Sequence, residues 1–191
     1  MKFQKEEAPV IPSKEIVVGD ASAKVQVVMF GDYESDACAK ASGVVGELLE
    51  DYKGKINFVF RHFPLTKIHQ KAHKAAEAAI GAAQEGKFWE MHQYLFSHRR
   101  NLGIISLKSY AREVGVTDKK FLEHLMNSHY GWFVQDDLKE GIDLGVTEVP
   151  SFFINGVRLE KEPTYKNLEA AINELLTKKI PAAKAKEKKR A

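Results

Sequence analysis

Two residues that could do thiol or hydroxyl chemistry stand three positions apart in the stretch FGDYESDACAKA, at Ser35 and Cys38, and Cys38 is the only cysteine in the chain. A thiol becomes a nucleophile when it ionises, and a helix N-terminus favours the thiolate. One cysteine cannot form an internal disulfide or supply the thiolate set of a zinc or iron–sulfur site. Two interpretations stay open: a helix cap at Ser35 beside a buried, inert Cys38, or a one-cysteine chemistry such as a mixed disulfide with a partner.

Histidines offer a second candidate constellation. His69, His73 and Glu77 fall at i, i+4 and i+8, so one helix face could present all three. A single face of this kind is more often solvated, and the chain has no H-E-x-x-H, so no metal site is expected. His62 precedes Phe63-Pro64 and is expected to end a strand. The aromatic residues expected in the core are Trp89, Trp132, Phe152 and Phe153.

Composition predicts a soluble globular protein with one main domain. The chain has 191 residues, of which 44% are apolar and 29% charged. No apolar run approaches the roughly 20 residues that a membrane span needs. The start, MKFQKEEAPVIPSKE, lacks the apolar core of a secretory signal. The sequence as given is therefore expected in the cytoplasm, or in the periplasm or outside the cell if it is a processed form.

The net charge of +3 divides unevenly along the chain. From Lys178 onward the end carries seven Lys/Arg and one Glu, which leaves 22 basic and 25 acidic residues in the body. A basic end of this composition predicts a disordered tail over residues 179–191. It contains no aromatic residue to stack on bases, so nucleic-acid binding is not expected.

Hydrophobic periodicity predicts the elements that position Ser35 and Cys38. Residues 1–14 are expected to be an extended lead-in to a domain over 15–178, and β-branched runs predict strands over 24–30 and 56–63 around a helix over 35–52. A helical block follows over about 66–144, with Ser106 expected to cap one of its helices. Asn155-Gly156 predicts a hairpin after strand 151–154, and Thr164 a final capped helix. The order is β-α-β, helices, then β-β-α, which predicts an α/β thioredoxin fold with a central mixed sheet and a helical insertion.

The sequence resembles the DsbA-like branch of the thioredoxin superfamily, a family of thiol–disulfide oxidoreductases, over about residues 19–178. The matching segments are the run from Phe30 into SDAC, RHFPL from Arg61, KFWEMHQYLF from Lys87, and GVTEVPSFFINGVRL from Gly145. In that family the motif is C-P-x-C, and its first cysteine attacks a disulfide. Here Ser35 occupies that position, Asp36 replaces the proline, and only Cys38 is kept. The resemblance also implies a cis peptide bond before Pro150.

This resemblance, with its departures, implies a degenerate site that cannot run dithiol exchange alone. It implies binding of an extended peptide or protein partner in a groove formed by Asp36 and Ala37, beside Ser35 and Cys38, and by Val149 and Pro150. The alternative is an enzyme that uses Cys38 in mixed disulfides, or Ser35 to hold the thiolate of glutathione, as in kappa-class glutathione transferases. No cofactor is expected otherwise, and glutathione stays open.

Overall fold

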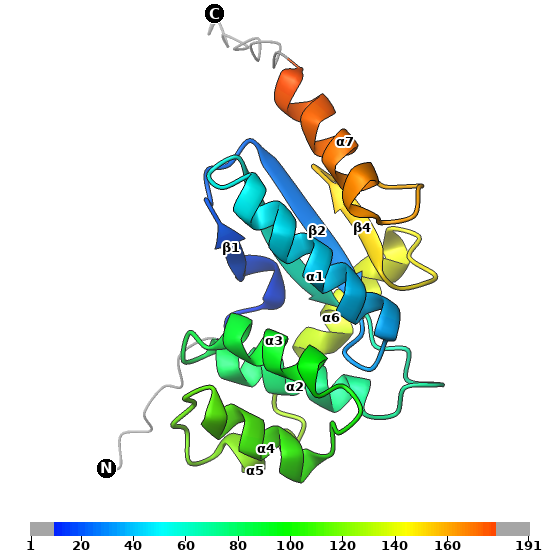
Figure 1. Cartoon of the computed structure of the whole chain (residues 1–191). Coiled ribbons are helices and arrows are strands. Elements are labelled where there is room, and N and C mark those ends of the chain that lie inside the picture. Colours follow the sequence, from blue (N-terminus) through cyan, green and yellow to red (C-terminus); the bar gives the residue numbers. More distant parts are fainter. Residues whose placement is uncertain (1–9, 179–191) are drawn as a thin grey trace, which may run out of the picture.

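The computed structural model describes residues 10–178 and contains a five-stranded mixed sheet in the order β1-β3-β2-β4-β5 (Figure 1). The central strands β2 (Val25–Gly31) and β3 (Ile56–His62) run parallel. On one side, β4 (Ser151–Ile154) pairs antiparallel with β2, and β5 (Val157–Arg158) with β4. On the other side, β1 (Val17–Gly19) pairs antiparallel with β3. This is the expected mixed sheet with one additional edge strand.

Helices cover both faces of the sheet. Figure 1 shows α1 (Asp36–Asp51) and α7 (Tyr165–Thr177) on one face and α6 (Gly131–Asp143) on the other. Thr164 caps α7 as predicted, because its hydroxyl accepts a hydrogen bond from the amide of Asn167. The described helices include none that is long and apolar enough to cross a membrane.

The helical block lies beyond one end of the sheet and comprises α2 (Ala72–Ala83), α3 (Phe88–Ser97), α4 (Ile104–Glu113) and α5 (Phe121–Met126). The small residues of α2 are buried against these helices. They let neighbouring backbones approach closely. At Gly81, an added Cβ would lie 2.9 Å from the rings of Phe121 and Tyr130.

The expected lead-in over residues 1–14 is wrong at its described C-terminal end. Residues 13–15 form a short 3₁₀ helix, and Ser13 is buried. The following strand β1 was not predicted, because three residues give no periodicity; it forms because β3 would otherwise leave an edge of unpaired backbone groups. The rest of the lead-in, residues 1–9, and the predicted tail over 179–191 lie outside the described residues.

Two further predictions in the helical regions are wrong. Ser106 does not cap α4: the helix begins at Ile104 after Gly103, since Ile104 and Leu107 both pack into the core, and the Ser106 hydroxyl bonds to Asn101 instead. Trp132 is not a core residue but is 83% exposed, because α6 turns a different face toward the sheet. The Asn155-Gly156 turn is as predicted, with positive φ at both residues.

Close packing of α6 on the sheet yields a stability prediction. A Cβ at Gly141 would lie 2.6 Å from the Phe63 ring and 3.1 Å from that of Phe30. We expect Gly141→Ala to lower the free energy of unfolding by about 1–3 kcal/mol, since the rings and helix must shift apart. Gly43→Ala in α1 is the matched control: its Cβ would meet nothing within 4 Å, and we expect a gain of about 0.5–1 kcal/mol from helix propensity. Urea denaturation measures both, and equal effects would contradict the packing argument.

Candidate functional site

Ser35 and Cys38 lie where the chain leaves β2 and enters α1. Ser35 is the N-cap of α1, and its Oγ accepts a hydrogen bond from the amide nitrogen of Cys38 at 3.2 Å. Serine suits this position because its hydroxyl satisfies an amide that has no partner within the helix. The capping interpretation made from the sequence is confirmed. The Ser35 Oγ thus accepts from the backbone, while its O–H can still donate to the Cys38 thiol.

The Cys38 thiol is completely buried, with no exposed surface. Burial raises its pKa from 9.0 to about 11, although hydrogen bonds from the Ser35 side chain and the Asp32 amide act in the opposite direction. The Asp32 nitrogen lies 3.4 Å from Sγ. A thiol in this environment stays protonated at neutral pH and lacks the anion that attacks disulfides.

Asp32 is a buried carboxylate that fixes the loop before Ser35. It accepts hydrogen bonds from the amides of Glu34 at 2.7 Å and Leu65 at 2.8 Å, and it lies 2.9 Å from Nδ1 of His69. Glu34 in turn accepts from the amide of Lys71 at 2.7 Å. These contacts tie the site loop to the segment between β3 and α2.

His69 therefore does not share a metal site with the other residues of its predicted helix face. It precedes α2 and faces Asp32, whereas His73 contacts Glu77 at 3.1 Å. Within residues 10–178, no group of three His, Cys, Asp or Glu residues is arranged to hold a metal ion.

A buried hydrogen-bonded chain, not found from the sequence, joins the site loop to α3. The Tyr33 hydroxyl lies 3.0 Å from Nδ1 of His92, and Nε2 of His92 lies 3.2 Å from the hydroxyl of Ser42 on α1. Burial first, and the charge of His62 second, lower the pKa of His92 to about 3, so the ring is neutral at physiological pH. A signal was present in the sequence: His92 stands on the apolar stripe of Phe88, Met91, Leu95 and Phe96.

The opposite side of the site is the loop before β4. The Val149–Pro150 peptide bond is cis, and the next residue, Ser151, is paired with Phe30 at the end of β2. Val149 packs against the core cluster that contains Cys38. Strand pairing thus brings this loop to the end of the sheet from which the site loop departs.

Asp36 and Ala37 are exposed at the start of α1. Asp36 forms an ion pair with Nε of Arg99, which follows α3. The hydrogen bond from Arg99 lowers the pKa of Asp36, and the charges of Arg99, Arg100 and Lys40 add to this effect. A negative charge at this position also interacts favourably with the helix dipole.

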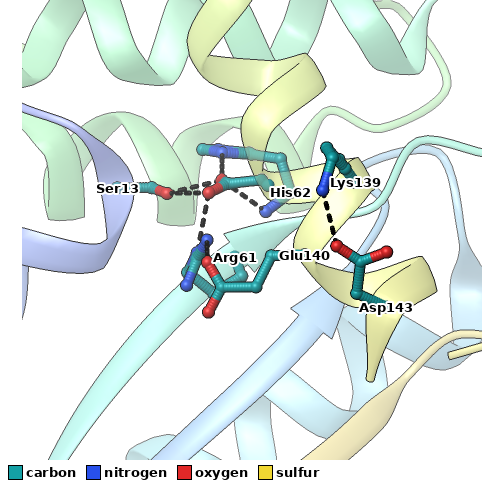
Figure 2. A network of polar contacts seen from close by, with 7 residues as sticks. Ser13, Arg61, His62, Lys139, Glu140 and Asp143 are labelled. Carbon is teal, nitrogen blue, oxygen red and sulfur yellow. Dashed lines mark hydrogen bonds and ion pairs between the residues drawn. The ribbon is translucent and has the colours of Figure 1, made fainter. Parts of the chain in front are cut away.

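Behind the site, Asp137 of α6 joins three elements. Ser13 from the 3₁₀ helix and Arg61 and His62 from β3 all contact this carboxylate. Figure 2 labels these three residues and draws Asp137 between them without a label. Asp137 accepts from the Ser13 hydroxyl at 2.6 Å, from Arg61 Nε at 2.7 Å and from the His62 amide at 2.9 Å. The His62 ring completes the set at 2.8 Å. His62 ends β3, as predicted, and its ring lies 5.9 Å from that of Tyr33.

The family was established by comparison with known proteins. The thioredoxin family model, described as "Thioredoxin", matches residues 12–174, and the chain belongs to this family. Three solved structures share the fold, and the names of two of them describe a thioredoxin-like oxidoreductase and a thiol-disulfide exchange protein.

The first of these structures is oxidised BdbD from Bacillus subtilis, with a TM-score of 0.78 and 21% identity over 85% of this chain and 92% of that one. The second is a thioredoxin-like oxidoreductase from Silicibacter pomeroyi DSS-3, with a TM-score of 0.75 and 25% identity over 86% of this chain and 93% of that one. The third is the thiol-disulfide exchange protein alpha-DsbA2 from Wolbachia pipientis, with a TM-score of 0.72 and 21% identity over 83% of this chain and 86% of that one.

Curated relatives are much longer proteins. The Na(+)/H(+) antiporter NhaA 1 of Salinispora arenicola (strain CNS-205) is 39% identical over 165 residues, which are 86% of this chain and 25% of that protein. The chain thus spans about a quarter of the length of the curated relatives it matches.

The buried Asp137 predicts a pH-dependent stability. Burial acts to raise its pKa, but hydrogen bonding to His62 and the charges of His62 and Arg61 outweigh burial and lower it. The contribution of ionised Asp137 to the free energy of unfolding is therefore complete above the unfolded-state pKa of about 3.9. It is lost as the pH falls through the lower folded-state pKa. We expect Asp137→Asn to lower the free energy of unfolding by about 3 kcal/mol at pH 7. The variant should also lose less stability than the wild type when the pH is lowered.

Asp143→Asn on the same helix is the control. Its ion pair with Lys139 is exposed (Figure 2), and we expect a change within about 0.5 kcal/mol. Urea denaturation as a function of pH measures both variants. Similar behaviour of the two would show that the buried network does not stabilise the fold.

Proposed function

We propose that this chain is a DsbA-like thioredoxin-fold protein that does not catalyse dithiol exchange alone and instead binds an extended peptide or protein partner beside its cis-proline loop. The observation that carries the proposal is the pairing of a hydroxyl at Ser35 with a buried, protonated thiol at Cys38. Disulfide transfer needs a thiolate to attack and a second thiol to resolve the mixed disulfide. This chain has one sulfhydryl in total, and it is not exposed.

The cis-proline loop supports the proposed binding of an extended peptide or protein partner. An extended chain can add to exposed backbone groups as a short strand, and the backbone at Val149 precedes the cis-proline beside the end of β2. Four hollows of about 200 to 440 Å³ among the described residues are lined by neither Ser35 nor Pro150.

The cellular location belongs to the same proposal. One structure with this fold is named a periplasmic thioredoxin-like protein, from Salmonella enterica serovar Typhimurium, with a TM-score of 0.69. A processed, periplasmic or secreted form of this chain agrees with that name. The cytoplasmic expectation stays a prediction, and fractionation of the native host with an antibody to the chain tests both.

Catalysis is tested by restoring the missing sulfur. We expect the wild-type chain to leave the rate of insulin reduction by dithiothreitol unchanged, and Ser35→Cys to accelerate it, since the Ser35 side chain is within hydrogen-bonding reach of the Cys38 thiol. Ser35→Ala is the control, which removes the cap at a cost of about 1 kcal/mol without adding a thiol. Wild-type catalysis comparable to that of Ser35→Cys would refute the proposal.

Reactivity of Cys38 separates the proposal from the one-cysteine and glutathione alternatives. We expect Cys38 to be alkylated slowly in the folded protein and rapidly in urea, because its thiol is buried and its pKa is about 11. Intact mass after incubation with oxidised glutathione should show no adduct without denaturant. A native adduct at Cys38, or glutathione-induced amide shifts around residues 32–38 and 148–151, would favour the alternative.

A further inference from the structure

Positive charge gathers on the α1 side of the site. Lys40 lies one helical turn after Asp36, the first residue of α1, and Arg100 is the chain neighbour of Arg99, so the three cations lie around the helix start. Arg99 is paired with Asp36. Lys40 and Arg100 are exposed and have no ion-pair partner within residues 10–178.

A second group of cations flanks the loop before Ser35. Lys71 is held next to this loop through its amide, which bonds to Glu34. Lys67 lies two positions before His69, which contacts Asp32. Both lysines are exposed, and neither side chain has an ion-pair partner in the described part of the chain. The site loop is therefore bordered by basic residues on two sides.

Four acidic residues stand among these five cations. Asp36 is paired with Arg99, Asp32 is buried and contacts His69, Glu34 accepts a hydrogen bond from the amide of Lys71, and Glu148 is exposed in the loop before Pro150. The cations exceed the acidic residues by one here, whereas the chain before Lys178 has 22 basic and 25 acidic residues. A basic border on an acidic body attracts negatively charged ligands to this one place.

We propose that the site takes an acidic segment of an extended polypeptide, whose Asp or Glu side chains pair with Lys40 and Arg100 while its backbone lies along the cis-proline loop. This inference rests on the proposed function and names its substrate class. A protein ligand is favoured over a nucleic acid because the aromatic residues of this region are buried and offer no stacking surface: Tyr33 is 1% exposed, Phe63 6% and Phe96 5%. Exposed Ile68, next to Lys67, offers an apolar contact instead.

Fluorescence anisotropy with matched peptides tests the inference. One peptide carries several glutamates, and its partner has glutamine at those positions. We expect the acidic peptide to bind about tenfold more tightly, a difference of about 1.4 kcal/mol, which two or three exposed ion pairs can supply. The preference should shrink between about 0.05 M and about 0.5 M NaCl, because salt screens exposed charges.

Two double variants with the same change in charge localise the effect. Lys40→Gln/Arg100→Gln should remove most of the preference for the acidic peptide. Lys119→Gln/Lys166→Gln is the control, since both lysines are exposed and lie elsewhere: Lys119 precedes α5, and Lys166 follows Tyr165, whose hydroxyl contacts Asp51 at the far end of α1. Equal losses in the two double variants would mean that net charge, and not this site, selects the peptide.

The remaining outcomes separate this inference from the function on which it rests. If both peptides bind equally and Pro150→Ala weakens both, the proposed function holds and the acidic preference is refuted. If neither peptide binds, the proposed function fails and this inference fails with it. If a single-stranded oligonucleotide binds as tightly as the acidic peptide and loses affinity in Lys40→Gln/Arg100→Gln, the ligand class is wrong.

Discussion

The hydrogen bond from the Cys38 amide to the Ser35 hydroxyl fixes the start of α1, and the chemistry of the site depends on it. A helix start offers free amides and a positive dipole end, which stabilise an anion. In this chain the Ser35 hydroxyl and the Asp36 carboxylate interact with the helix start. The Cys38 sulfur, one turn further on, is buried. The feature that would activate a thiolate at position 35 therefore stabilises the helix instead.

Two buried carboxylates hold the parts of the site in place. Asp32 fixes the loop between β2 and α1 to the segment after β3, and Asp137 fixes α6 to β3 and to the 3₁₀ helix. Each accepts several hydrogen bonds, which satisfy its buried oxygen atoms. The neutral His92 adds a third link from Tyr33 to α1. The backbone of the site loop is thus supported from three sides.

The hydrogen bonds that hold the site loop agree with a role of the site in binding a polypeptide. A rigid loop, a cis-proline backbone and a border of unpaired cations are suited to holding a chain without breaking a bond in it. The longer curated relatives show that this kind of domain also occurs within larger proteins. Their names describe those proteins as wholes and leave the ligand of this domain to be found by experiment.

The sequence by itself determined the order of elements, the thioredoxin architecture, the caps at Ser35 and Thr164 and the turn at Asn155-Gly156, because these follow from local periodicity, capping and backbone preference. It also located the candidate site, the motif at Ser35 and Cys38. Only the tertiary structure decided what surrounds that motif: the partners of His69, the Asp137 network, the His92 link and the exposure of Trp132. Those contacts join residues about 40 to 120 positions apart, as between Ser13 and Asp137, and the spacing of neighbours along a chain does not specify which distant side chains will meet.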